Sequence, residues 1–323
     1  MALMSRYPNK HFDTVIHCDF LNNELPDKCA NLIIADPPYF KVKGSFDFVW
    51  ESFEYYLKDV EKWAIECKRL LADNGTLLWY GDAKKIAYTQ LIFDKYFNLL
   101  NNIVWENTND HKQQIRFNEE LRSFAPLTER ILMYSNDKYN LTQCVFIIRD
   151  YIREEIIKSK GSLVLKQVNE ALGTATNGGG VASACLSLDK AEPTMITKEM
   201  YKKLQAWCRP YLRKEYEELR KEYEELRRPF NNDLHLGDVI RLPNYETGKF
   251  DHDTIKPEKL TRILLNTCSL KNDLVIVPFA GSGTECAMAV KEGRKVIGYD
   301  IEKKYVDMSN KRIKTFKDAP ILF

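Results

Sequence analysis

The sequence lacks the patterns that mark several large classes of protein. None of its eight cysteines forms a C-x-x-C pair, so the spacing indicates neither a zinc module nor a disulfide scaffold, and we expect a reduced, cytoplasmic protein. Nowhere do about 18 apolar residues run uninterrupted, as a membrane span requires. Residues 1–13 contain no apolar stretch of the kind that secretion signals carry. We therefore expect neither export nor a membrane partner.

Charge of one sign is not in excess either. The formal net charge is +2, which is too small to indicate a polyanionic partner by itself, although local clusters of Lys and Arg can still form a binding face. A length of 323 residues suits one large domain or a core with a sizeable insertion, and the hydrophobic content of 44% is enough for a packed interior. The composition predicts an ordinary globular protein.

Short apolar strands alternate with amphipathic helices at both ends of the chain. The first set lies in residues 1–140 and includes TVIHCDF, NLIIADPPY, GTLLWYGD, NNIVWEN and ERILMYS; the second lies in residues 235–323 and includes NDLVIVPFAGSG and KVIGYD. Such alternation predicts the α/β class, with a doubly wound, mainly parallel sheet and helices on its faces. We expect both segments to share one sheet and to form one domain.

Residues 141–234 differ in character and predict an inserted helical region. A doubled heptad, KEYEELRKEYEELRR, places apolar side chains at 4,3,4,3 spacing on one helical stripe, at Leu212, Tyr216, Leu219, Tyr223 and Leu226. Because a sustained coiled coil needs at least about three heptads, we expect this stripe to pack within its own domain, with a dimer seam as the alternative. The Gly-rich segment 173–184 is expected to be a disordered linker, with a DNA-facing loop as the alternative.

The stretch NLIIADPPYF ends an apolar strand with an acid, two prolines and aromatic residues. Pro37 and Pro38 cannot donate to a ladder or continue a helix, so the strand must end there. Asp36 and Tyr39 therefore lie at the carboxyl end of a strand, which is where open α/β sheets bind ligands. A plain turn or cap role is the alternative for Asp36.

A second strand, in VIVPFAGSGTECA, ends in a turn whose Gly281 and Gly283 let the backbone approach a ligand closely. Cys286 stands where a dinucleotide fingerprint needs a small residue, and GTE stands where a Walker A loop needs GK[ST], which weakens both phosphate-binding interpretations. Asp300 ends the next strand and is placed to accept hydrogen bonds from ribose hydroxyls, although it also suits a helix cap. The pattern favours an adenosine cofactor without pyrophosphate, such as S-adenosylmethionine.

Together these motifs resemble the β class of DNA amino-methyltransferases. DPPY precedes the FxGxGT turn, as in that class, and seven stretches resemble its blocks in the expected order: HCDFLNNELPDKCANLIIADPPY, KRLLADNGTLLWYGD, NNIVWEN, ERILMYS, HDTIKPEKL, VPFAGSGT and VIGYDIEKKYV. The resemblance covers nearly the whole chain. It implies a Rossmann-like methyltransferase fold, with residues 141–234 as the target-recognition region and double-stranded DNA as the substrate. It also raises a homodimer and a cognate restriction endonuclease as partners.

The chemistry of this class explains the DPPY residues. An exocyclic base amine is a poor nucleophile because its lone pair is delocalised into the ring. Asp36 and the carbonyl of Pro37 are expected to accept the amino hydrogens from a loop that Pro37 and Pro38 hold rigid, and Tyr39 offers an aromatic face to the base. A paired base reaches such a site only when it is flipped out of the duplex, and Phe40 is expected to help hold it. The reaction requires no metal.

The resemblance also implies a set of cofactor contacts. Thr254 and Lys256 are expected near the methionine end, Asp19 near the adenine and Phe279 beside the adenosyl group. For Asp19 a turn role and for His252 a plain loop role stay open. The full set of expected cofactor-binding residues is Asp19, Asp36, His252, Thr254, Lys256, Phe279, Gly281, Ser282, Gly283, Thr284 and Asp300.

Target recognition is assigned less directly. Lys112, Arg116 and Arg122 follow a strand in a polar stretch and can pair with phosphates and guanines, with a solvated face as the alternative. Adenine N6 is the expected target, because cytosine enzymes of the family more often carry Ser at the position of Asp36. Cytosine N4 methylation, a non-catalytic DNA-binding protein, a nucleotide-dependent oxidoreductase and an RNA or protein methyltransferase remain alternatives.

Overall fold

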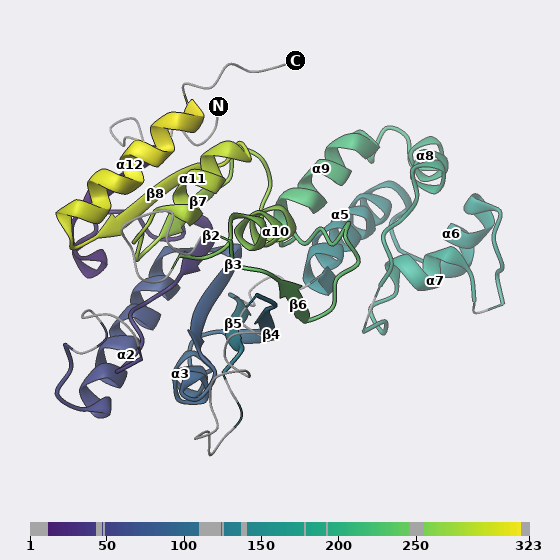
Figure 1. The fold of residues 1–323 in the computed structure, drawn as a ribbon. Helices are drawn as coiled ribbons and strands as arrows, with labels where there is room; N and C mark the ends of the chain where they lie inside the picture. Colours follow the sequence, from purple (N-terminus) through teal and green to yellow (C-terminus); the bar gives the residue numbers. More distant parts are fainter. Residues whose placement is uncertain are drawn as a thin grey trace. The chain divides into compact units, whose positions relative to one another are not determined.

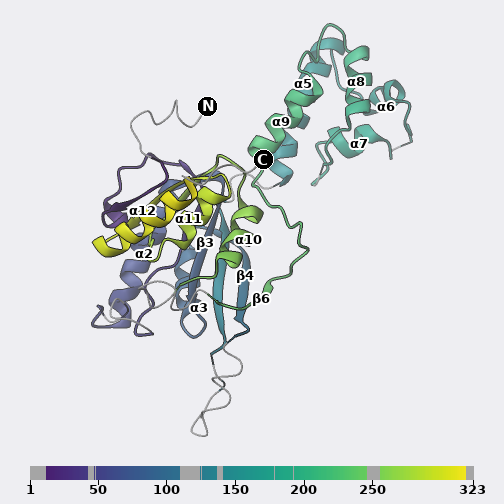
Figure 2. The same cartoon turned by 45° about the horizontal axis from the view of Figure 1, so that its top comes forward.

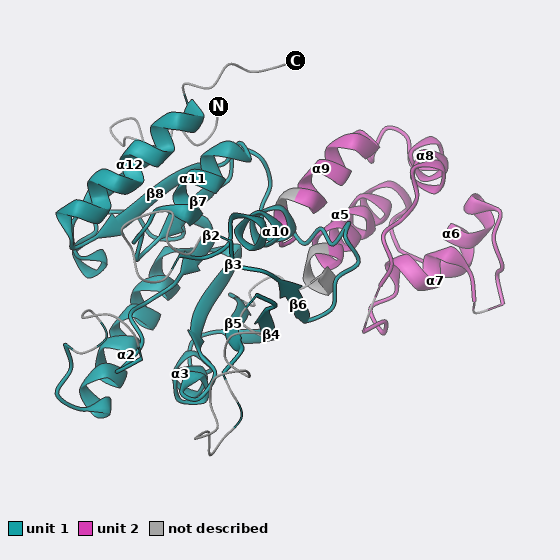
Figure 3. Cartoon of the chain, in the orientation of Figure 1, with its two compact units in different colours: residues 1–137, 229–323 teal, residues 138–228 magenta. Residues whose placement is uncertain are grey.

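A computed structural model of the chain describes residues 12–42, 47, 49–109, 124, 126–136, 141–177, 179–191, 193–245 and 255–317. The chain divides into two compact units (Figure 3). The first unit comprises residues 1–137 and 229–323, and the second comprises residues 138–228. Each unit has its own arrangement of elements and its own core.

An eight-stranded sheet runs through the first unit in the order β1-β8-β7-β2-β3-β5-β4-β6 (Figure 1). The strands are β1 (Thr14–His17), β2 (Ala30–Ala35), β3 (Leu71–Asp82), β4 (Asn98–Asn107), β5 (Thr128–Ser135), β6 (Val239–Leu242), β7 (Leu274–Val277) and β8 (Lys295–Asp300). Neighbouring strands are parallel except where β5 pairs with β3 and β4. Because β7 lies between β8 and β2, the two ends of the chain share one sheet, which confirms the predicted fold class.

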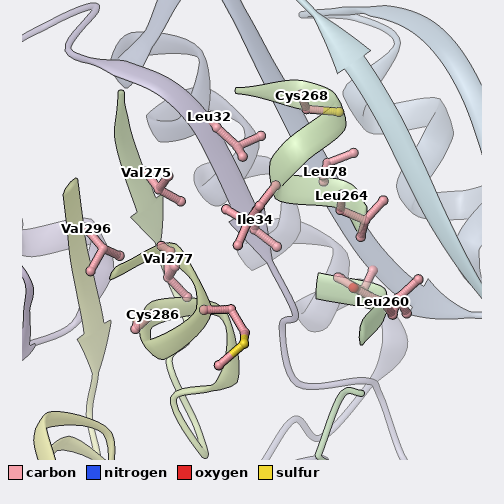
Figure 4. Close-up of a cluster of buried hydrophobic side chains, with 14 of the residues drawn as sticks. Leu32, Ile34, Leu78, Leu260, Leu264, Cys268, Val275, Val277, Cys286 and Val296 are labelled. Atoms are coloured by element: carbon pink, nitrogen blue, oxygen red, sulfur yellow. The ribbon is translucent and has the colours of Figure 1, made fainter. Parts of the chain in front are cut away.

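Alternate side chains of the central strands enter two different cores. Leu32 and Ile34 of β2 point into one core, and Ile33 and Ala35 point into the other, as the two-residue period of a strand requires. Figure 4 shows the first core, in which Leu32, Ile34 and Val275 lie among side chains from helices. Burial on both faces explains why these strands read as continuous apolar runs.

Helices cover both faces of the sheet (Figure 2). One face packs against α2 (Phe53–Leu70) and α3 (Ile86–Phe93), and the other against α10 (Glu258–Cys268), α11 (Thr284–Lys291) and α12 (Lys303–Lys317). Ser52 caps α2 by accepting the Tyr55 N–H at 3.4 Å. A short 3₁₀ helix, η1 (Phe20–Asn22), follows β1. This two-sided covering is the doubly wound arrangement.

The second unit is helical. Its elements are α5 (Leu141–Lys160), α6 (Leu165–Leu172), α7 (Val181–Leu186), α8 (Lys198–Trp207) and α9 (Tyr216–Leu226). Leu219 and Tyr223 of the heptad stripe are buried in the unit's own core, as expected for internal packing. In the part of the chain that the structure describes, no helix, including the 20-residue α5, is long and apolar enough to cross a membrane.

The expectation of a disordered linker at 173–184 is wrong for the residues described there. The side-chain oxygen of Asn169 accepts hydrogen bonds from the Thr174 hydroxyl at 2.9 Å and the Ala182 N–H at 2.8 Å. Gly180 lies so close to Asn169 that a Cβ would stand 2.4 Å from the Asn169 Cγ. The glycines therefore allow a tight fold around one buried amide, and composition alone does not reveal that amide.

Candidate active site

A cleft of about 1030 Å³ opens where β1, β8, β7, β2 and β3 end. Because β5 runs in the opposite direction, its first residues reach the same edge of the sheet. Every described residue that lines the cleft belongs to the first unit. This edge, beside a sheet covered by helices on both faces, is where α/β proteins of this kind bind ligands.

The described walls of this cleft are strongly acidic. They contain nine acids and three lysines, which are Asp19, Asp36, Asp47, Asp59, Asp82, Glu129, Glu285, Asp300 and Glu302, and Lys62, Lys256 and Lys304. The chain as a whole carries a net charge of +2. The cleft therefore favours a cationic or neutral ligand over an anionic one.

Four polar side chains meet at the centre of the cleft. Asp36 follows β2 directly, and its two carboxylate oxygens accept the Tyr39 hydroxyl at 2.7 Å and the Lys256 ammonium at 2.9 Å. Glu129, at the start of β5, accepts the same two donors, Lys256 at 3.0 Å and Tyr39 at 3.2 Å. One ammonium and one phenol thus hold two carboxylates in fixed orientations.

Burial and charge set the protonation of the two donors. Lys256 is 4% exposed, and burial alone would lower the pKa of its ammonium, but the carboxylates of Asp36 and Glu129 reverse this and raise it above its ordinary value. Burial, reinforced by the same two carboxylates, raises the pKa of the Tyr39 phenol well above its usual range. Both groups therefore act as donors at neutral pH.

The DPPY loop is fixed at both ends. Pro37 is buried, and the Tyr39 N–H donates to the Asp47 carboxylate. The Phe40 carbonyl accepts the Lys85 ammonium. The Phe40 ring packs against the rings of Phe53 and Tyr56, at centroid distances of 5.4 and 6.0 Å. It does not line the described walls of the main cleft, whereas Asp36, Pro37, Pro38 and Tyr39 all do.

The glycine turn after β7 is tied to the end of β8. The Gly281 N–H donates to Asp300 Oδ2 at 2.8 Å, and Asp300 Oδ1 accepts the Glu302 N–H at 2.8 Å. Asp300 thus caps the chain entering α12, as the alternative anticipated, and it also lines the cleft, so the ribose role stays a proposal. Gly281 and Ser282 line the cleft as well.

Gly283 and Thr284, by contrast, face the helices behind the turn. Gly283 has φ +75°, and a Cβ there would lie 2.5 Å from the Ser309 hydroxyl. The Thr284 hydroxyl accepts Arg312 at 3.0 Å. Neither residue lines the described cleft, so both support the shape of the turn.

The opposite wall is aromatic. Phe279 follows β7, and its ring meets the ring of Trp63 edge-on at a centroid distance of 4.9 Å. Asp19 lies nearby in the same cleft and accepts the Leu21 N–H at 2.9 Å as the cap of η1. The expected turn role of Asp19 is thus observed, and its contact with an adenine stays a prediction.

Several predicted site residues lie outside the described residues. They are Lys112, Arg116, Arg122, His252 and Thr254. Three residues that the sequence did not single out lie in or beside the cleft, which are Glu129, Glu285 and Tyr80. A signal existed for Glu129, because an acid opens the apolar strand ERILMYS, but its use depends on the direction of that strand. For Glu285 the signal is an acid inside the apolar run after the glycine turn.

The described residues fit a cofactor that joins an adenosine to a cation. An aromatic wall suits a flat base, acids at two neighbouring strand ends suit ribose hydroxyls, a close-approach glycine turn lies between them, and the carboxylates suit a positive charge. The fold and the site together therefore define an α/β methyltransferase.

The comparison with known families agrees, and the chain belongs to the DNA methylase family of N6 and N4 methyltransferases, whose match covers residues 30–311. Among curated relatives, the Type II methyltransferase M2.DpnII of Streptococcus pneumoniae is 26% identical over 333 residues, which are 97% of this chain and 94% of the relative. The DNA adenine methyltransferase YhdJ of Escherichia coli K12 is 24% identical over 307 residues, which are 93% of this chain and 82% of the relative.

Solved structures confirm the fold. The TTHA0409 DNA modification methylase of Thermus thermophilus, complexed with S-adenosyl-L-methionine, matches with a TM-score of 0.53 at 17% identity, over 95% of this chain and 96% of that one. The cytosine-N4-specific PvuII DNA methyltransferase matches with a TM-score of 0.53 at 14% identity, over 94% of this chain and 89% of that one. The family assignment makes S-adenosylmethionine the cofactor, which supplies a methyl group activated on a sulfonium.

Proposed function

We propose that this DNA methyltransferase transfers the methyl group to the N6 amine of an adenine that is flipped out of a specific duplex sequence. The observation that carries the proposal is the position of Asp36. Its carboxylate lies at the end of β2, in the same cleft as the glycine turn, and is held there by Tyr39 and Lys256. An acceptor so placed can orient an amine toward the cofactor's methyl group.

Asp36 keeps acceptor capacity for a substrate. Each carboxylate oxygen has about two lone-pair sites, and the described contacts with Tyr39 and Lys256 use one on each oxygen. A remaining site on Asp36 accepts one amino hydrogen, and the Pro37 carbonyl accepts the other. Both acceptors draw electron density toward the nitrogen and favour its tetrahedral form. Tyr39, Pro38 and the buried Pro37 keep this geometry rigid.

Adenine is the proposed base, and cytosine is the second candidate. The relative YhdJ is named a DNA adenine methyltransferase, which supports adenine. The PvuII enzyme, which shares the fold, is named cytosine-N4-specific, which supports the alternative. Both bases present an exocyclic amine to the same acceptors, so the position of Asp36 suits either.

The second unit is the proposed target-recognition region. Residues 138–228 contain 17 Lys and Arg against 13 Asp and Glu, a net charge of +4, whereas the first unit carries −2. Phosphates are attracted to the basic unit, and the acidic cleft admits an uncharged base while it repels the backbone. Lys112, Arg116, Arg122 and Phe40 remain proposed DNA contacts. A homodimer and a cognate endonuclease also remain proposals, the latter supported by the Type II name of M2.DpnII.

The test is methyl transfer from labelled S-adenosylmethionine to mixed-sequence duplex DNA, followed by digestion and identification of the labelled nucleoside. We expect N6-methyladenine. N4-methylcytosine would overturn the base assignment and keep the mechanism. Label in RNA or protein but not in duplex DNA would overturn the proposed substrate.

Asp36→Asn tests the proposed acceptor. The amide presents an N–H where an acceptor is needed and removes the charge that Lys256 pairs with. We expect kcat to fall by roughly 10²–10³-fold, the loss typical of removing one group that acts on the reacting centre. Asp307→Asn, at an exposed residue paired with Lys303, is the matched control and should leave kcat unchanged. An Asp36→Asn enzyme with unchanged kcat would disprove the role of Asp36.

A further inference from the structure

Glu285 is a buried acid for which the fold provides no partner. It lies in the first turn of α11, is 5% exposed and lines the cleft. Its Oε1 atom is fully buried and has no hydrogen-bond partner among the described residues. Leaving a buried polar atom without a partner typically costs about 1–3 kcal/mol, so native proteins rarely keep one without a reason.

The cations near Glu285 are already engaged. Lys256 binds Asp36 and Glu129. Arg312 binds the Ser282 carbonyl at 2.8 Å, the Thr284 hydroxyl at 3.0 Å and Glu258 at 3.2 Å. The nearest aromatic hydroxyl, on Tyr80, is itself buried without a partner. The amino end of α11 favours a carboxylate, but it supplies only partial positive charge.

We propose that Glu285 is the carboxylate that pairs with the cationic end of the cofactor and makes the site prefer the sulfonium substrate to the thioether product. S-adenosylmethionine carries one more positive charge than S-adenosylhomocysteine, because sulfur loses its charge when the methyl group leaves. A carboxylate that faces the cleft beside the glycine turn interacts with that difference directly. The inference depends on the cofactor alone, so it holds whichever base is methylated.

The preference requires an ionised Glu285. Burial first, and the Asp36 charge second, raise the pKa of the free carboxyl to about 7, against weaker lowering by Lys256 and Arg312. A bound cation stabilises the ionised form, so cofactor binding must release protons near neutral pH. Affinity for S-adenosylmethionine must therefore increase as pH rises through this range, while affinity for the neutral thioether does not gain in the same way.

The experiment is isothermal titration of the whole protein with S-adenosylmethionine and with S-adenosylhomocysteine, at pH 6 to 8, for the wild type and Glu285→Gln. In the variant at pH 8 we expect Kd for S-adenosylmethionine to rise on the order of tenfold, and Kd for S-adenosylhomocysteine to change about twofold or less. Glu292→Gln, the same change just after α11 at a residue paired with Arg262, is the matched control and should alter neither Kd.

A second measurement needs no variant. Titration of the wild type in buffers of different ionisation enthalpy at pH 7 should show proton release with S-adenosylmethionine that exceeds the release with the thioether. Equal losses of both affinities in Glu285→Gln, or no loss of either, would overturn the proposal. Equal proton release for the two ligands would overturn it even if the variant failed to fold. A failure of DNA methylation with these binding differences intact would refute only the proposed function.

Discussion

Lys256 neutralises most of the charge at the centre of the cleft. Among the described residues, its ammonium is the only side-chain cation bound to Asp36 and Glu129, and it lies 5.1 Å from the centroid of the Tyr80 ring. A buried ion pair contributes little net stability when it is intact, but removing one partner leaves the other charges uncompensated. The geometry therefore predicts that this residue matters for stability as well as for the reaction.

Lys256→Met should destabilise the protein by roughly 2–4 kcal/mol, somewhat less than a fully buried pair costs, because Glu129 is 34% exposed. Adding Glu129→Gln to Lys256→Met should recover about 1 kcal/mol, since one of the two stranded carboxylates is then neutral. Urea unfolding of the single and double variants measures both values. Lys303→Met, at an exposed pair, should change little. Strictly additive losses would refute the shared-cation arrangement.

Glu285 makes stability depend on pH with a defined sign. Its pKa rises from 4.5 in the unfolded chain to about 7 in the folded protein, so the folded state binds this proton more tightly. The contribution is largest below pH 4.5 and falls by about 3 kcal/mol as pH rises to 7, after which it stays constant. Glu285→Gln should therefore be more stable than the wild type at pH 8.

Denaturant unfolding at pH 5 and pH 8 checks this prediction. Glu292→Gln should show the opposite trend, because ion pairing lowers the pKa of Glu292 despite its partial burial and so stabilises the folded state as pH rises. A Glu285→Gln protein that gains no stability between pH 5 and pH 8 would show that Glu285 is not buried in its charged form.

At the scale of elements, the ends of strands decide what the sequence could reveal. Pro37 after β2 and Gly281 after β7 are local stop signals, so both strand ends, and with them Asp36 and the glycine turn, were predictable. The direction of β5 was not, because a two-residue period is the same in either direction. Glu129 reaches the cleft only because β5 is antiparallel, which explains why it was missed.

The glycine turn depends on α12 as much as on β7. Gly283→Ala places a methyl group 2.5 Å from the Ser309 hydroxyl and 2.7 Å from its Cα, at φ +75°. We expect a loss of about 3 kcal/mol, from strain at positive φ together with overpacking, and weaker cofactor binding as α12 shifts. Gly293→Ala has φ +79° and meets Lys271 only at 3.8 Å, so it should lose about 1 kcal/mol and keep its cofactor affinity. Equal losses in the two variants would show that Ser309 yields and that the contact imposes no constraint.

At the scale of the whole molecule, the chain forms three buried clusters, and each is confined to one unit. The two clusters on the faces of the sheet use only residues of the first unit, and the third uses only residues between Val145 and Leu226. The change of composition near residue 141 predicted such an insertion, because helical periodicity replaces alternating strands there. The strand β6 was not predicted, since its four residues, VIRL, stand alone in a polar segment after the insertion.

Separate cores imply that cofactor binding does not need the second unit. Replacing residues 138–228 by a flexible linker should leave a protein that binds S-adenosylmethionine within about threefold of the wild type, because the described cleft walls and both sheet-face cores lie outside the excised segment. The same protein should lose sequence-specific methylation of duplex DNA, since a net charge of +4 is removed and the remainder carries −2. Titration of the cofactor and methylation of a mapped site measure the two outcomes in parallel. If site-specific methylation survived the excision, target recognition would have to reside in the first unit, where Lys112, Arg116 and Arg122 would become the first residues to substitute.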